Sequence, residues 1–184
     1  YGLTASYGSS ATDDSAVSLS RVSSSWGLGG PLPDGLTRAN DLVVDSLGNI
    51  YIADSGNSRV RKYSPAGVWI ANWPTSVVAL AIDASDNIYA LKEDSSGVVK
   101  FDTSGNELLS WGSAGYGGVN GQFWNPHGID VGPDGSVYVA DTDNSRIQKF
   151  DNLGNFISKW GVYGQGDSEF GYPDDVAVDS NGDV

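Results

Sequence analysis

Residues 42–54 read LVVDSLGNIYIAD, and this stretch returns along the chain. It recurs as LAIDASDNIYALK at residues 80–92 and as IDVGPDGSVYVAD at residues 129–141, and a fourth copy begins as VAVDSNGDV at residues 176–184. Each copy holds two short runs rich in β-branched residues around a tight turn of Gly, Asn or Asp, which is the pattern of a β-hairpin. The copies predict the first two strands of a repeating β unit.

Two further strands follow the hairpin in each full copy, and the last of them ends in a tryptophan, at Trp73, Trp111 and Trp160. Trp26 holds the same place in an earlier, incomplete copy. A small four-stranded sheet buries its faces only by stacking on its own copies, which is the arrangement of a propeller blade. We therefore predict an all-β propeller of four-stranded antiparallel blades, with about four blades' worth of chain.

Several phrases resemble the NHL-repeat β-propeller family. Residues 57–63 (NSRVRKY) and 144–150 (NSRIQKF) look like its signature, and residues 126–131 (PHGIDV) and 173–178 (PDDVAV) look like its opening strand. Residues 156–161 (FISKWG) look like its closing strand. The resemblance covers residues 26–184 and implies a ring of usually six blades.

The second repeat departs from this signature. There Lys92, Ser95 and Gly97 stand where the other repeats have Asp, Asn and Arg. The resemblance therefore implies that this repeat lacks the polar contact between blades that the signature provides.

The organisation of the chain follows from these repeats. Residues 26–184 are expected to form the propeller, with repeats near 39–73, 77–112 and 126–161 and a truncated repeat from residue 173. Residues 1–25 are expected to complete a blade through an outer strand and a loop. Three interpretations stay open: a ring closed by its own first and last strands, a piece of a longer propeller, and an assembly in which neighbouring chains exchange strands.

Composition excludes several classes of partner and site. Ten Lys and Arg stand against 23 Asp and Glu, a formal net charge of −13. Nucleic acids and anionic membranes bind clustered cations, so neither is expected as a partner, and no apolar run suits membrane insertion. The absence of Cys and the single histidine, His127, exclude thiolate and multi-histidine metal sites. The acidic, Ser- and Gly-rich surface favours an extracellular or cell-surface location in a bacterium or archaeon.

The starts of the innermost strands are expected to surround one mouth of the central channel. Aligning the repeats places Asn40, His127 and Asp174 at one level of this rim and Asp41 and Asp175 at the next. The rim could hold a cation or a small polar ligand, although a solvated rim is the simpler interpretation. No cofactor is expected; the alternative is a calcium ion, since one imidazole among oxygen donors suits calcium better than a transition metal.

A second candidate site lies in the long Gly-rich loops after Trp111 and Trp160. Tyr116, Trp124, Tyr163 and Tyr172 do not repeat with the blades and are free to bind a ligand. The repeated tryptophans are instead predicted to pack between blades.

The charged signature recurs with the fold and is predicted to be structural. It consists of Asp54, Asn57 and Arg59 in the first repeat and of Asp141, Asn144 and Arg146 in the third. The arginines are expected to bridge strands or blades, held by the aspartates.

Three functions stay open. We expect a non-enzymatic binding or scaffolding propeller that acts through its loops and blade edges on a protein partner or on itself, and no catalytic residue is assigned. The first alternative is a structural subunit of an extracellular assembly or filament. The second is a metal-dependent lyase of the kind found among NHL-like propellers, in which His127 and Asp174 would carry the chemistry.

Overall fold

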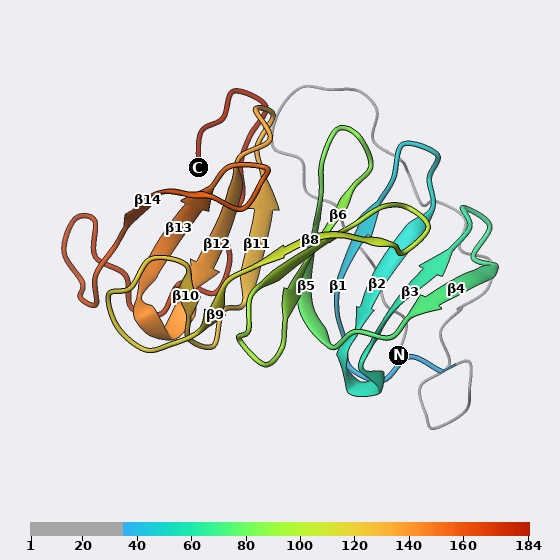
Figure 1. The fold of residues 1–184 in the computed structure, drawn as a ribbon, viewed down its shortest axis with the longest axis horizontal. Coiled ribbons are helices and arrows are strands. Elements are labelled where there is room, and N and C mark those ends of the chain that lie inside the picture. Colours follow the sequence, from blue (N-terminus) through green and yellow to red (C-terminus); the bar gives the residue numbers. More distant parts are fainter. Residues whose placement is uncertain (1–34) are drawn as a thin grey trace.

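The computed structural model of the protein describes residues 35–184, which form three four-stranded antiparallel sheets and contain no α-helix (Figure 1). In every sheet each strand pairs with its neighbour in sequence. The first blade comprises β1 (Ala39–Val44), β2 (Ile50–Asp54), β3 (Arg59–Tyr63) and β4 (Trp69–Trp73). The second comprises β5 (Val77–Ile82), β6 (Ile88–Lys92), β7 (Val98–Phe101) and β8 (Glu107–Trp111). The third comprises β11 (Gly128–Val131), β12 (Val137–Asp141), β13 (Arg146–Phe150) and β14 (Phe156–Trp160).

The turn between the first two strands of a blade is closed by an aspartate. The Asp45 carboxylate accepts hydrogen bonds from the backbone N–H groups of Leu47 and Asn49 and from the Tyr51 hydroxyl, at 3.0, 2.7 and 2.9 Å. Gly48 in this turn has a φ of 81°, which favours glycine. Asp83 closes the turn of blade 2 in the same way, whereas blade 3 has Gly132 at this position and its turn is closed by Asp134, which accepts a hydrogen bond from the Ser136 N–H.

The blades stack through their tryptophans. Trp73 at the end of blade 1 lies between Tyr51 of its own blade and Phe101 of blade 2, with ring centroids 5.3 and 5.4 Å away. Trp111 lies in the same way between Tyr89 of blade 2 and Phe150 of blade 3. The predicted packing between blades is confirmed at both positions.

The other two tryptophans of the series differ. Trp160 packs edge-on against Tyr138 of its own blade and stays half-buried. Trp26 lies outside the described residues.

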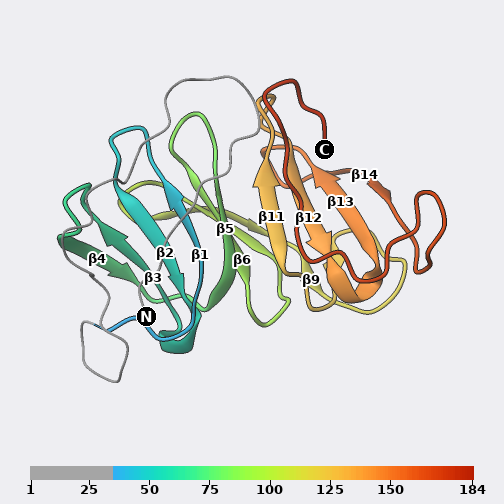
Figure 2. The ribbon, with the colours of Figure 1, turned by 180° about the vertical axis from the view of Figure 1, so that it is seen from behind.

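The innermost strands β1, β5 and β11 lie side by side, and the blades fan outward from them (Figure 2). Carboxylates bridge β1 to β5 and β11 to the segment from residue 173. Asp41 accepts a hydrogen bond from the Leu80 N–H at 2.7 Å, and Asp130 accepts one from the Val178 N–H at the same distance. Within residues 35–184 the blades form an open arc, consistent with an incomplete propeller ring (Figure 1).

The segment from residue 173 occupies the place of a fourth inner strand without being one. Val176 is buried against blade 3, and Asp179 closes a turn with Asp183 as in the other repeats. No described strand pairs with this segment, so it is not part of a sheet. The truncated repeat is therefore present as a docked segment rather than as the predicted strand. The predicted contribution of residues 1–25 lies outside the described residues.

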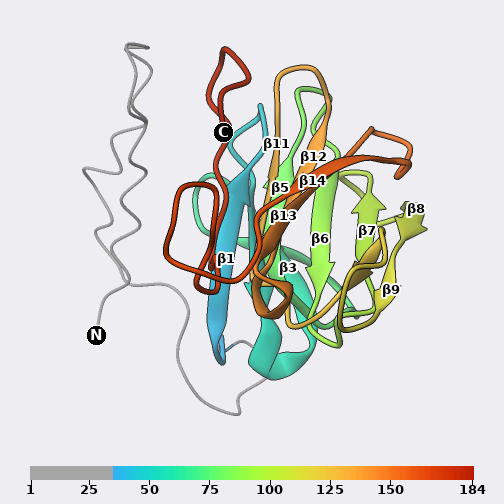
Figure 3. The ribbon, with the colours of Figure 1, turned by 90° about the vertical axis from the view of Figure 1, so that its left-hand side faces the viewer.

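One face of the arc carries the features that matter for function, and we call it the loop face. It holds the connections between blades and the turns between the second and third strands (Figure 3). Two of these turns are the short 3₁₀ helices η1 (Ser55–Asn57) and η2 (Thr142–Asn144). The connection between blades 2 and 3 contains a small parallel pair, β9 (Ser113–Ala114) and β10 (Gln122–Phe123).

Candidate functional site

The charged signature holds the interblade loop against blade 3. Asp141 is fully buried and lies 2.7 Å from the Nε of Arg146. The Arg146 guanidinium donates to the carbonyl groups of Val119 and Gln122, both in the loop of residues 112–126. The Asn144 side chain holds the same loop at Gly115 and Gly117, by a bond to each backbone. Asp141, Asn144 and Arg146 therefore hold one another and the loop in place.

The same set recurs in blade 1, where Arg59 pairs with buried Asp54 at 2.7 Å and donates to the Gly35 carbonyl. Asn57 also bonds to Asp54 and to Gly35. The structural role predicted for both sets is confirmed.

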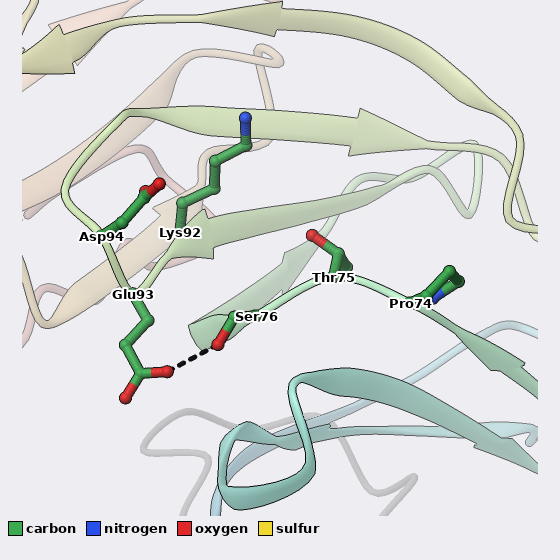
Figure 4. Close-up of a pocket in the computed structure, with 6 residues that line it drawn as sticks. All are labelled: Pro74, Thr75, Ser76, Lys92, Glu93 and Asp94. Carbon is green, nitrogen blue, oxygen red and sulfur yellow. Dashed lines mark hydrogen bonds between the residues drawn. The ribbon is translucent and has the colours of Figure 1, made fainter.

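Blade 2 replaces this signature with a different ion pair. Glu93 accepts a hydrogen bond from the Ser76 hydroxyl at 2.6 Å (Figure 4) and pairs with Arg38, which precedes β1, at 3.0 Å. This repeat therefore lacks the contact of the signature, as expected, and Glu93, next to the substituted Lys92, supplies a different polar contact between blades.

A shallow hollow of about 420 Å³ lies beside this ion pair, where the loop joining blades 1 and 2 is short. It is lined by Pro74, Thr75, Ser76, Lys92, Glu93 and Asp94 (Figure 4). In that view the side chains of Lys92 and Asp94 point away from Glu93 rather than toward a common centre.

The rim residues predicted from the alignment are only partly brought together. His127 Nδ1 lies 3.2 Å from the Asp174 carboxylate, and both side chains are exposed. Asn40 is exposed and makes no side-chain hydrogen bond within residues 35–184. Asp175 is exposed and accepts a hydrogen bond from the Val176 N–H at 2.9 Å.

The Asp41 carboxylate has a structural role and is not free to bind a ligand. It bonds to the N–H groups of Leu42 and Leu80, at 2.7 Å each. Burial raises the pKa of Asp41, the two hydrogen bonds oppose this shift, and the nearby charges of Asp175 and Asp130 add to it. Among residues 35–184 no three His, Asp or Glu side chains are grouped so that they could hold a metal ion. The rim thus offers one exposed imidazole–carboxylate pair, His127 and Asp174.

The four loop aromatics, in contrast, meet at one place. A hollow of about 730 Å³ opens on the loop face over η2, and all four side chains line it. Tyr116 and Trp124 come from the loop before blade 3 and lie edge to face at 6.3 Å. Tyr163 and Tyr172 come from the loop after blade 3 and lie edge to face at 5.6 Å. We call this site the aromatic hollow.

The aromatic hollow has a polar lining that sequence reasoning missed. Asp143 and Lys159 line it beside the aromatic rings. The Lys159 ammonium donates to the Gly118 carbonyl, whereas the Asp143 carboxylate has no hydrogen bond within residues 35–184. Asp143 varies between the two signature copies, as Gly56 in the first and Asp in the third. That difference was the available signal.

Tyr172 is held in an unfavourable backbone conformation. Its φ is 66°, and the equivalent positions before blades 1 and 3 also have positive φ, at Arg38 (58°) and Asn125 (47°). Three of the four equivalent positions are thus left-handed, a conformation that Asn tolerates and that costs a bulky L-residue roughly 1–2 kcal/mol. Thr142 fixes the following residue by donating from its hydroxyl to the Pro173 carbonyl at 2.9 Å. A tyrosine at this position is therefore not explained by backbone preference.

With the blades and their loop anchors described, the sequence can be compared with known proteins. The profile of the NHL repeat matches residues 36–63 and 123–150. The chain carries NHL repeats. The matched segments cover the first three strands of blades 1 and 3, with their Asp–Asn–Arg signatures. The family resemblance is confirmed, and no curated protein matches the sequence.

Solved structures share the propeller fold at low sequence identity. Kuenenia stuttgartiensis hydrazine synthase is 16% identical, with a TM-score of 0.64 over 84% of this chain and 42% of that chain. A streptogramin B lyase is 20% identical, with a TM-score of 0.56 over 71% of this chain and 42% of that chain. A Bacteroides thetaiotaomicron protein of unknown function is 22% identical, with a TM-score of 0.58 over 73% of this chain and 40% of that chain. This chain thus spans about two-fifths of these structures, and the likeness shows the fold alone.

Among residues 35–184 no helix has the length and apolar character needed to cross a membrane.

Proposed function

We propose that this propeller is a non-enzymatic binding module whose ligand occupies the aromatic hollow. The observation that carries this proposal is the convergence of Tyr116, Trp124, Tyr163 and Tyr172, from two different loops, on one hollow of about 730 Å³. That volume lies within the usual range of small-molecule sites. Exposed aromatic side chains gathered around a concavity favour a binding role, because isolated surface aromatics need no explanation but a cluster does.

The walls of the hollow support binding without large rearrangement. The loop of residues 112–126 is anchored to blade 3 through Arg146, Asn144 and Gln148, and Gly121 donates its N–H to the Gln148 side chain at 3.0 Å. A loop fixed in this way loses little conformational entropy when a ligand binds.

The test is ligand-observed NMR with the full chain and a panel of probes. The panel contains neutral oligosaccharides, choline, inorganic phosphate, and one acidic and one basic hexapeptide. At least one probe is expected to bind the wild type and to lose binding in Trp124→Ala, while Trp69→Ala serves as the control because Trp69 is an exposed tryptophan on β4. The proposal is contradicted if no probe binds, or if every bound probe is indifferent to Trp124→Ala.

A lyase is the second candidate, and the His127–Asp174 pair at the channel rim favours it. The structural neighbours include a streptogramin B lyase and a virginiamycin B lyase from Staphylococcus aureus whose H270A variant is catalytically inactive. The identities of 20% and 11% to these enzymes carry no activity over to this chain. Incubation with a streptogramin B substrate tests this candidate, and turnover that is lost in His127→Ala would establish it over the binding role.

The remaining proposals concern the location of the protein and its partners. We propose an extracellular or cell-surface location, supported by the net charge of −13 and the Ser- and Gly-rich sequence. A protein partner or self-association is proposed at the blade edges, and a structural subunit of an assembly is the alternative. Sedimentation of the purified chain tests self-association, and a monomer at all concentrations would exclude it.

A further inference from the structure

We propose that the ligand of the aromatic hollow is a neutral carbohydrate of two or more sugar units. This inference rests on the proposed binding function and names its ligand class. Sugars carry apolar C–H faces and a surrounding belt of hydroxyl groups, so they need flat apolar surfaces and hydrogen-bonding groups in the same site. The aromatic hollow supplies both.

The apolar surfaces come from two aromatic corners. The rings of Tyr116 and Trp124 meet at 78°, and the rings of Tyr163 and Tyr172 meet at 65°. In an edge-to-face pair the rings use one face and one edge on each other, so each pair leaves further ring faces open. The four side chains are 77%, 45%, 70% and 55% exposed in that order. Two separate corners favour a ligand with at least two units over a single small ring.

The hydrogen-bonding groups are the polar tips of the same rings and their neighbours. Within residues 35–184 nothing bonds to the hydroxyl groups of the three tyrosines or to the indole N–H of Trp124. The Asp143 carboxylate is equally free of described partners and is an acceptor for sugar hydroxyls. These groups can donate to and accept from a polyhydroxylated ligand without breaking a bond of the fold.

The charge balance excludes strongly charged ligands. The Arg146 guanidinium is buried, pairs with Asp141 and donates to loop carbonyl groups, so its charge is balanced within the fold and little of it faces a ligand. Lys159 and Asp143 on the wall are of opposite sign. An anionic ligand would meet Asp143 and the net charge of −13, and a cationic one would meet Lys159. A neutral ligand meets no unbalanced charge.

Tyr172 supplies an independent observation. Its backbone is in the left-handed region, a conformation that Asn adopts at the equivalent position 125. A strained residue at a binding surface points to a role for its side chain. The substitution Tyr172→Asn therefore separates the two roles, because it relieves the backbone while removing one ring of the hollow.

The experiment measures binding of cellotriose, maltotriose, mannotriose and chitotriose to the full chain by calorimetry and by saturation-transfer NMR. Choline, inorganic phosphate and a heparin tetrasaccharide are the charged comparison probes. At least one neutral sugar is expected to bind, and Trp124→Ala and Tyr172→Asn are each expected to weaken it at least tenfold. Tyr172→Asn is also expected to keep or raise the melting temperature, and Trp69→Ala is expected to change nothing.

The outcomes separate this inference from the function on which it rests. If no neutral sugar binds while choline, phosphate or heparin binds in a Trp124-dependent way, the carbohydrate assignment is wrong and the binding function stands. If a sugar binds but neither substitution weakens it, the aromatic hollow is not the site and both statements fail. If nothing binds, both fail as well.

Discussion

Replacing Trp73 by Ala removes the side chain that lies between blades 1 and 2. Trp73 is 4% exposed and packs against Tyr51 and Phe101. A buried aromatic takes about 150–250 Å² out of water, which at ~25 cal/mol per Å² is roughly 4–6 kcal/mol of transfer free energy. The indole N–H has no hydrogen-bond partner among residues 35–184, and an unpaired buried donor costs about 1–3 kcal/mol. We therefore expect Trp73→Ala to lower the free energy of unfolding by about 3 kcal/mol.

Urea denaturation followed by circular dichroism measures this loss. Trp69→Ala is the matched control, because Trp69 lies on the same strand and is 52% exposed, so it should stay within about 0.5 kcal/mol of wild type. Trp73→Phe should recover most of the loss, since it keeps a ring between Tyr51 and Phe101 and removes the unpaired N–H. If the free energy of unfolding of Trp73→Ala lies within about 1 kcal/mol of the wild-type value, Trp73 does not hold blades 1 and 2 together. Equal losses at positions 69 and 73 would refute this role as well.

Two further predictions concern charged groups. Arg146→Ala should lower the free energy of unfolding by about 3–5 kcal/mol, because it leaves the buried Asp141 charge unpaired. Arg38→Ala breaks an exposed pair and should lower it by less than about 1 kcal/mol. Urea titration of both variants measures these losses, and similar values would contradict the structural role assigned to Arg146. Burial acts to raise the pKa of Asp45, but hydrogen bonds from Asn49 and its neighbours outweigh burial, so the pKa is lowered. The ionised carboxylate therefore stabilises the fold at a pH above the pKa of an unfolded Asp, about 3.9, and this stabilisation is lost as the pH falls below that value. The free energy of unfolding should therefore decline below about pH 4, and Asp45→Asn should flatten that decline; an unchanged profile in the variant would remove Asp45 as its cause.

The sequence predicts the features that repeat. Residue patterns that return at fixed positions predict the hairpins, the four-stranded blades and the packing of tryptophans between blades. Trp73 and Trp111 lie where the pattern places them. The convergence of the loop aromatics was not predictable in detail, although their failure to repeat marked them as candidates. Where they meet depends on how Arg146 and Asn144 anchor the loop.

What the sequence could not supply is the register between neighbouring blades. The sequence makes Asp41 a candidate for ligand binding at the rim, but its carboxylate accepts a hydrogen bond from the Leu80 N–H of the next inner strand. Arg38 reaches Glu93 across a similar distance in sequence. Both contacts join residues from different repeats, and pairing between repeats leaves no periodic signal within one repeat. The segment from residue 173 differs from the predicted strand for another reason: an inner strand pairs with the second strand of its own blade, and no described strand pairs with this segment, which bonds to β11 through Asp130.

Each blade is a meander in which every strand pairs with its immediate neighbour in sequence. Each strand pair is therefore joined by a short loop, which keeps the entropy cost of closing the loop small. Each blade accordingly has a low contact order although it is all β. Contacts between blades come later in sequence: Trp73 and Trp111 pack across the two joints, and Asp41 bonds to Leu80 between blades 1 and 2. Folding should accordingly proceed by early formation of single blades and slower docking of one blade on the next. Substitutions within a blade's hairpins should then change the folding rate, and substitutions at the joints should chiefly change the unfolding rate.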